Sequence, residues 1–266
     1  MASLKLHRWG NPTAPAWLCL HGFMGTGSDW DTFACAALAL NPNLSILAPD
    51  LPGHGESSSV DVDLFESQIF ALLDVENLGP VTLIGYSLGG RLGLQTILSD
   101  AHRFSAFVGI STSAGLDIQS ERDQRKDLDC QLATRLKGIT TEYAFRQFLS
   151  DWWELPVFKS QTRSLGMKSS FIESRMKQTP QTLAESLMRW SPGVLPSLWD
   201  SLGEFHGRSL FLAGADDEKY AQISKKLAAK IPDARFQILA AAGHQILIEK
   251  PLEAARCVVD FLQHRS

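Results

Sequence analysis

The sequence predicts an α/β protein, in which a mostly parallel sheet is flanked by helices and carries an inserted helical cap. Short apolar runs alternate with amphipathic segments through the first hundred residues, which is typical of βαβ units around a parallel sheet. Two further apolar runs follow near the C-terminus, and the long interval before them shows only helical periodicity. The sheet is therefore expected to be interrupted and then resumed.

Six apolar runs have the length and composition of buried strands. In chain order they are 16–20 (AWLCL), 45–48 (SILA), 81–84 (VTLI), 104–110 (FSAFVGI), 209–213 (SLFLA) and 235–239 (RFQIL). One helix is expected to begin near Gly90, and two others are expected at 220–230 and 252–264. Each strand is followed by a loop that can carry functional side chains.

The segment 115–203 is predicted to form the helical cap, inserted between the two parts of the core, 1–114 and 204–266. Prolines interrupt its helical periodicity, which indicates several short helices. Residues 121–189 carry 12 Lys and Arg against 9 Asp and Glu, a net charge of +3, whereas the rest of the chain carries −7. This excess indicates either an anion-binding lid or the solvated faces of surface helices.

The composition narrows the classes of function. With 266 residues, 44% hydrophobic and 20% charged, the chain resembles a soluble globular protein, and its net charge of −4 favours neither nucleic acid nor an anionic membrane as a partner. We expect a cytoplasmic protein, because there is no signal-peptide pattern, no apolar run of roughly 18 residues, and no paired spacing among the four cysteines. The histidines lack metal-ligand spacing and no dinucleotide fingerprint occurs, so no metal and no cofactor are expected.

Residues 85–89 (GYSLG) form a G-x-S-x-G motif, directly after the strand run 81–84 and directly before a helix. A turn this tight strains the backbone at Ser87 and presents the serine hydroxyl at a helix N-terminus. Free amides at that terminus stabilise negative charge on a reacting oxygen. Ser87 is therefore the predicted catalytic serine.

A catalytic serine needs a base, and a carboxylate should fix the tautomer of that base. Of the seven histidines, His244 lies in the loop after the run 235–239, where sites of open α/β sheets assemble. Asp217 follows the run 209–213 and is favoured over its neighbour Asp216 as the carboxylate. Ser87, Asp217 and His244 are the predicted catalytic residues.

Two loops near the N-terminus complete the predicted site. His21, Gly22 and Phe23 follow the first strand run, and we expect the amides of Phe23 and Leu88 to form an oxyanion hole. The segment 50–55 (DLPGHG) follows the second run and is typical of a turn scaffold, in which His54 is expected to have a structural role.

Together these motifs resemble the α/β-hydrolase superfamily over essentially the whole chain: LHGF, DLPGHGES, GYSLGG, a G-x-x-D and a late GH, in the order Ser, Asp, His. More narrowly, the chain resembles the 2-succinyl-6-hydroxy-2,4-cyclohexadiene-1-carboxylate synthase family of menaquinone and phylloquinone biosynthesis. The narrower resemblance rests on GYSLGGR at 85–91, SAGL at 113–116 with two arginines after it, and DW at 151–152 followed by PVF at 156–158.

This resemblance implies a lyase that eliminates pyruvate from 2-succinyl-5-enolpyruvyl-6-hydroxy-3-cyclohexene-1-carboxylate, with the Ser–His pair acting as base. It implies a small anionic substrate with several carboxylates, which arginines of the cap can pair. The predicted substrate-binding residues are Tyr86, Arg91, Arg122, Arg125, Trp152, Phe158 and Arg175. Without the resemblance, Arg91 could equally be a salt-bridge residue, and the Trp and the Phe could belong to the core of the cap. The chain is expected to be a monomer or a homodimer.

Two other functions stay open. A serine hydrolase of a small ester, thioester or carbon-carbon bond would use the same residues with Ser87 as nucleophile, and analogy of fold does not separate it from the lyase. A non-catalytic relative that senses a small anion is the third possibility, although an intact set of Ser87, Asp217 and His244 argues against it.

Overall fold

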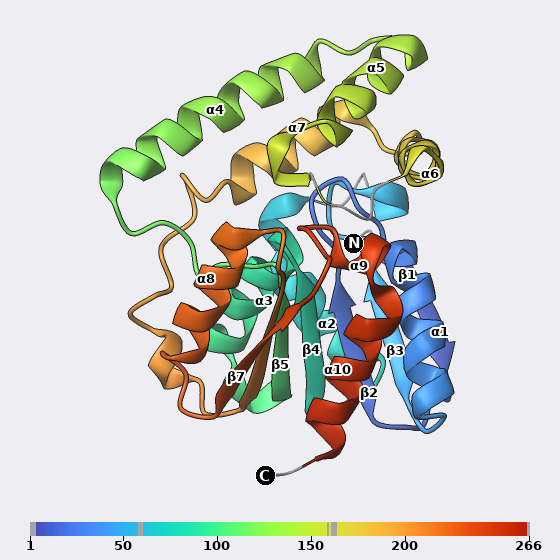
Figure 1. Ribbon diagram of the computed structural model, residues 1–266, viewed down its shortest axis with the longest axis vertical. Helices are drawn as coiled ribbons and strands as arrows, with labels where there is room; N and C mark the ends of the chain where they lie inside the picture. The colour runs from blue at the N-terminus through green and yellow to red at the C-terminus, as the bar shows by residue number, and fades with distance from the viewer. Residues whose placement is uncertain (1–3, 58–60, 159, 161–163, 265–266) are drawn as a thin grey trace.

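The computed structural model describes residues 4–57, 61–158, 160 and 164–264, which form a sheet flanked by helices with further helices above it (Figure 1). The seven strands lie in the order β1-β3-β2-β4-β5-β6-β7. Their bounds are Leu6–Gly10 (β1), Ala16–Leu20 (β2), Ser45–Pro49 (β3), Val81–Tyr86 (β4), Phe104–Ile110 (β5), Arg208–Gly214 (β6) and Ala234–Leu239 (β7). All pairings are parallel except that of β1 with β3.

The predicted α/β class and all six predicted strands are confirmed, the strand ends agreeing to within two residues. The strand that the sequence did not predict is β1, which lies at the edge of the sheet next to β3. Its residues, LHRWG, are half-buried or exposed, so it lacks the apolar run by which the buried strands are recognised.

Helices cover both faces of the sheet and bury two separate layers of apolar side chains (Figure 1). One layer includes residues of α2 (Phe65–Val75), α3 (Leu88–Ser99) and α8 (Glu218–Ala228). The other includes residues of α1 (Asp31–Leu40) and α10 (Pro251–Gln263), which pack against each other. A short helix, α9 (Ile246–Glu249), precedes α10. The helices predicted at 220–230 and 252–264 are α8 and α10, which begin two residues and one residue earlier, respectively.

In its described residues the cap contains four α-helices: α4 (Gln119–Lys137), α5 (Glu142–Trp153), α6 (Leu165–Arg175) and α7 (Pro180–Trp190). They lie together above the sheet (Figure 1), and no strand occurs in the described part of 115–203. The cap has its own apolar cluster, and Met24 of the core is buried in that cluster. Among the residues described, no helix is long and apolar enough to cross a bilayer.

Candidate active site

Ser87 occupies the turn between β4 and α3 in a backbone conformation that is rare for a residue with a side chain, with φ 51° and ψ −110°. Two hydrogen bonds hold this conformation. The Ser87 amide donates to the carbonyl of Ile110 at 2.8 Å, and the hydroxyl of Thr112 donates to the carbonyl of Ser87 at 2.8 Å. The neighbouring strand therefore supports the strained turn that the motif predicts.

The glycines of the motif are required by close backbone approaches. A Cβ atom added at Gly85 would lie 2.4 Å from the Cα of Gly90, and one added at Gly89 would lie 2.3 Å from the carbonyl oxygen of Leu20. Neither contact is possible for a real side chain, so the strand, the turn and the helix can approach this closely only without side chains at these positions.

Three side chains that are distant along the chain form one line of hydrogen bonds at the end of the sheet. The Ser87 Oγ lies 3.1 Å from the Nε2 of His244, and the Nδ1 of that histidine lies 2.7 Å from the Oδ2 of Asp217. Because the carboxylate only accepts, Nδ1 carries the proton and Nε2 presents its lone pair to the serine. Asp217 and His244 are buried, whereas Asp216 is exposed.

Aromatic rings surround the imidazole of His244. Their centroids lie 5.8 Å (Tyr86), 6.0 Å (Phe158) and 4.6 Å (Tyr220) from the centre of the imidazole ring. Burial raises the pKa of both tyrosine hydroxyls, so both stay neutral at physiological pH. Tyr220 was not predicted from the sequence. Its amide donates to the Oδ1 of Asp217, the N-cap of α8, at 3.3 Å, so its place in the first turn after Asp217 could have indicated it.

The loop after β2 holds the peptide between Gly22 and Phe23 in a defined orientation. The carbonyl of Gly22 accepts from the amide of Gly25 at 2.9 Å and from the Nδ1 of His21 at 2.8 Å. The Nε2 of His21 in turn accepts from the Leu51 amide at 2.9 Å, so the ring must be neutral to make both bonds, and burial lowers its pKa to about 4. In a trans peptide the N–H points opposite to the C=O, so the Phe23 amide faces away from these donors.

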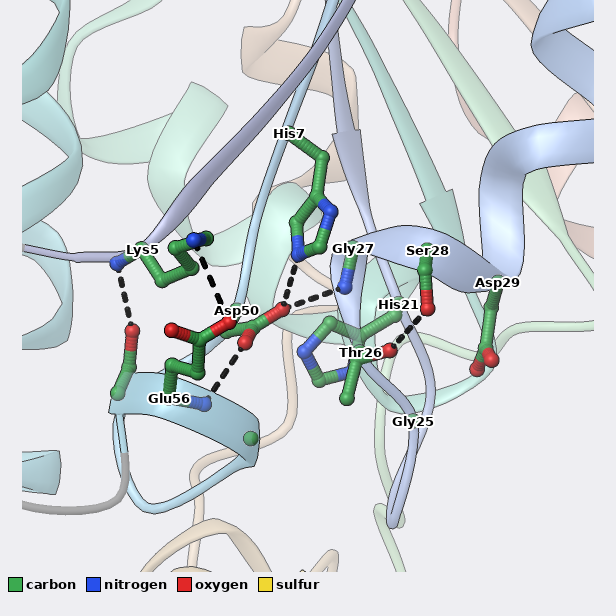
Figure 2. A network of polar contacts seen from close by, with 12 residues as sticks. Lys5, His7, His21, Gly25, Thr26, Gly27, Ser28, Asp29, Asp50 and Glu56 are labelled. Atoms are coloured by element: carbon green, nitrogen blue, oxygen red, sulfur yellow. Dashed lines mark hydrogen bonds and ion pairs between the residues drawn. The ribbon is translucent and has the colours of Figure 1, made fainter. Parts of the chain in front are cut away.

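Asp50 connects this loop to two other segments (Figure 2). Its Oδ1 accepts from the amide of Gly27 at 2.8 Å and lies 3.0 Å from the Nε2 of His7, and its Oδ2 accepts from the amide of Glu56 at 2.9 Å. The carboxylate is buried and serves as a shared acceptor for β1 and both loops. Asp50 therefore ties the DLPGHG segment to the loop that contains Phe23 and to β1.

His54 of the same segment is fully buried behind the site. Its Nδ1 lies 3.1 Å from the carbonyl of Pro52, and its ring is stacked on that of Trp190 with an interplanar angle of 4°. Burial lowers the pKa of His54 to about 3, so the ring is neutral. These contacts are those of a packing residue.

A cavity of about 200 Å³ lies between the cap and the core. Ten of the twelve predicted site residues line it, namely Phe23, Tyr86, Ser87, Leu88, Arg91, Arg125, Trp152, Phe158, Arg175 and His244. Asp217 lies behind His244, and Arg122 is not in the wall. The guanidinium of Arg122 instead donates to the carbonyl of Val194 at 3.4 Å.

Three arginines and two aspartates are among the described residues that line this cavity. Arg175 pairs with Asp29, and the Nε of Arg125 donates to Asp129 at 2.8 Å. Arg91 donates to the carbonyl of Trp190, and among the described residues no carboxylate forms an ion pair with it. Burial lowers the pKa of Arg91 to about 10, which leaves it charged at neutral pH. Within the part of the chain that the structure describes, Arg91 is therefore a buried cation without a carboxylate in an ion pair with it, and an anionic ligand could supply the counter-ion.

The two aspartates were not predicted from sequence, because acidic residues in a loop or on a polar helix carry no distinctive pattern. The described residues contain no group of three or more His, Cys, Asp or Glu side chains suited to a metal ion.

Comparison with known proteins places these features in context. A model of the alpha/beta hydrolase family matches residues 17–256. A Bacillus subtilis protein with the provisional name of 2-succinyl-6-hydroxy-2,4-cyclohexadiene-1-carboxylate synthase is 31% identical over 260 residues, which are 95% of this chain and 92% of the relative. The synthase of that name from Serratia proteamaculans is 29% identical over 98% of both chains. The solved structure of MenH from S. aureus has a TM-score of 0.89 at 30% identity, covering 99% of this chain and 98% of its own.

Proposed function

The chain belongs to the alpha/beta hydrolase family and, within it, to the family of the 2-succinyl-6-hydroxy-2,4-cyclohexadiene-1-carboxylate synthases, and on this premise we propose the reaction that it catalyses. It is a lyase that eliminates pyruvate from 2-succinyl-5-enolpyruvyl-6-hydroxy-3-cyclohexene-1-carboxylate. The product is 2-succinyl-6-hydroxy-2,4-cyclohexadiene-1-carboxylate. The observation that carries this proposal is the similarity to synthases over nearly the full length of both chains.

In the proposed mechanism the Ser87 hydroxyl acts as a base rather than as a nucleophile. The Nε2 of His244, 3.1 Å away, takes the serine proton, and the alkoxide removes the proton from the carbon next to the succinyl carbonyl. The electron pair moves through the ring as the bond between the ring carbon and the enolpyruvyl oxygen breaks. The departing enolpyruvate takes up the proton that His244 holds and becomes pyruvate, which returns the imidazole to its neutral form and leaves Ser87 as a hydroxyl. No water is consumed, and no acyl-enzyme forms.

Asp217 and two backbone amides stabilise the charges that develop. The carboxylate of Asp217 accepts from the Nδ1 of His244 and favours its positive form. Enolate charge on the succinyl carbonyl oxygen is stabilised by the amides of Phe23 and Leu88, the latter at the N-terminus of α3. These three groups act on the transition state, so removing any of them is expected to lower kcat.

Substrate carboxylates are proposed to pair with Arg91, Arg125 and Arg175. These side chains come from α3, α4 and α6, so both the core and the cap contribute to the wall. Tyr86, Trp152 and Phe158 form apolar surfaces against which the ring can pack, and they leave the carboxylates to the arginines. We assign no direct substrate contact to Arg122, because it lies outside the wall.

The alternative, a serine hydrolase with Ser87 as nucleophile, would use the same line of hydrogen bonds. It is not favoured, because the similar full-length relatives are named synthases. A direct test adds the purified protein to the enolpyruvyl precursor and couples pyruvate to lactate dehydrogenase. We expect release well above the spontaneous rate and a loss of about a thousandfold or more in Ser87→Ala. Silence toward the precursor, with a burst of acylated Ser87 from p-nitrophenyl acetate, would instead establish the hydrolase.

We propose that the protein acts in the cytoplasm as a monomer or a homodimer on a small anionic substrate. The support for this compartment is that Cys19, Cys35, Cys130 and Cys257 are all free thiols, as expected in a reducing environment. Fractionation of cells tests the location, and sedimentation of the purified protein tests the oligomeric state.

A further inference from the structure

Gln178 connects the cap to the loop that carries the Phe23 amide. It lies between α6 and α7 and is buried. Its Nε2 donates to the carbonyls of Met24 at 3.1 Å and Gly25 at 2.8 Å, and its Oε1 accepts from the amide of Gly55 at 2.8 Å. Only this orientation of the amide satisfies all three partners. One cap side chain thus holds two loops of the core.

These bonds continue as a chain to the proposed oxyanion hole. The Met24 carbonyl belongs to the same peptide as the Gly25 amide, and that amide donates to the Gly22 carbonyl at 2.9 Å. The Gly22 carbonyl in turn belongs to the peptide that carries the Phe23 N–H. Each trans peptide accepts on one side and donates on the other, so the bonds align and polarise one another. A single peptide unit, Met24–Gly25, therefore lies between the Gln178 amide and the peptide that carries the Phe23 N–H.

Met24 provides a second contact between this loop and the cap. Its backbone has φ 60°, which is unfavourable for a residue with a side chain, and its side chain is fully buried in the apolar cluster of the cap. The ion pair between Arg175 of α6 and Asp29 joins the cap to the same loop a few residues further on. The cap therefore contacts three kinds of group in this loop: the backbone carbonyls bound by Gln178, the apolar side chain of Met24 and the carboxylate of Asp29.

We propose that Gln178 is a positioning residue, which makes the orientation of the Phe23 amide depend on the seating of the cap on the core. With the cap seated, Gln178 holds the Gly22–Phe23 peptide with its N–H available to the developing oxyanion. When the cap lifts, the three bonds break and the loop loses this support. This inference rests on the proposed function, since it assigns Gln178 a part in the same reaction.

Pyruvate release by Gln178→Leu and by a matched control, Gln181→Leu, tests the proposal. Gln181 lies on α7 and donates to the carbonyl of Ile139 at 2.8 Å, so it bonds within the cap alone. We expect Gln178→Leu to lower kcat by about 10- to 100-fold, an effect no larger than that of removing one oxyanion-hole donor. Its KM should stay within about threefold of the wild-type value. The control should stay near the wild type in both. A loss confined to KM, or equal kcat in the two variants, would overturn the proposal.

Gln178→Glu supplies a second readout, which also serves if the leucine variant does not fold. An ionised carboxylate keeps the Gly55 bond but repels the carbonyls of Met24 and Gly25, whereas a protonated one can donate to one of them. The ratio of its kcat to that of the wild type should therefore rise as the pH falls. A ratio that is independent of pH would count against the positioning role.

Failure of the proposed function would be recognised separately. In that case the wild type releases no pyruvate, and the same variants are compared in the rate at which p-nitrophenyl acetate acylates Ser87. That step also needs an oxyanion hole, so Gln178→Leu should be slower than Gln181→Leu. Equal rates would overturn the role of Gln178 by themselves.

Discussion

Arg175 of the cap and Asp29 of the core face each other in the wall of the cavity, joined by two hydrogen bonds of 2.7 and 2.5 Å. The two residues are 146 positions apart in the chain. The pair neutralises a cation that the family resemblance assigns to substrate binding. A substrate carboxylate that pairs with Arg175, as we propose, has to share it with Asp29, so we expect the aspartate to influence how strongly a polyanion binds.

Removal of Arg175 alone should weaken substrate binding more than removal of the pair. In Arg175→Ala the Asp29 carboxylate is left in the wall without its counter-ion and repels the substrate, so KM should rise by about tenfold or more. The double variant Asp29→Asn with Arg175→Ala should recover part of that loss. A double-mutant cycle on KM measures the coupling, and strictly additive effects would show that the pair does not matter for binding.

The two arginines of α4 should differ although they lie about one helical turn apart. Arg125 lines the cavity, whereas Arg122 is directed to the carbonyl of Val194. Arg125→Ala should raise KM several-fold, and Arg122→Ala should leave it within about twofold. Steady-state kinetics of the two variants at equal ionic strength decide this, because salt weakens charge pairing in both. A larger effect from Arg122 would reverse the assignment.

Acid should destabilise the fold through its buried histidines. Burial lowers the pKa of His21 to about 4 and that of His54 to about 3. Between these values and about pH 6.5, the two rings are protonated in the unfolded chain but not in the folded one. Stability is therefore full above about pH 6.5 and falls below it, by about 1.4 kcal/mol per pH unit for each ring. Urea unfolding at pH 7, 6 and 5 measures this loss.

The matched variant for that experiment is His54→Gln, which keeps a donor for the Pro52 carbonyl but cannot be protonated. Its stability should depend less steeply on pH than that of the wild type. Parallel slopes would exclude His54 as a source of the acid sensitivity.

Alanine should be tolerated at Gly79 and not at Gly89. A Cβ atom at Gly89 would collide with the backbone of Leu20 and His21, whereas no atom lies within 4 Å of one at Gly79. We expect Gly89→Ala to lose about 3 kcal/mol or more of folding stability and Gly79→Ala to stay within about 1 kcal/mol. Thermal unfolding of the two variants tests this. An unchanged melting temperature in Gly89→Ala would mean that the turn around Ser87 can relax.

Sequence patterns sufficed for the parts of the molecule that depend on local chemistry. The buried strands were recognisable because their runs are continuously apolar, and the serine turn because only glycine fits at positions 85 and 89, two residues before and after Ser87. The edge strand Leu6–Gly10 was missed because one of its faces meets solvent and its residues are mixed. Asp217 and His244 could be selected because each follows a recognisable strand at its carboxyl end.

The amino-acid sequence by itself determined the α/β class, the strained serine turn and the three side chains at the strand ends, because each follows from apolar periodicity or from glycine spacing over a few residues. Only the tertiary structure decided that Arg175 meets Asp29, that Gln178 spans two core loops, and that Arg125 rather than Arg122 reaches the cavity. These outcomes depend on how the cap is placed on the core. Contacts between residues some 150 positions apart leave no local pattern that a single sequence can display.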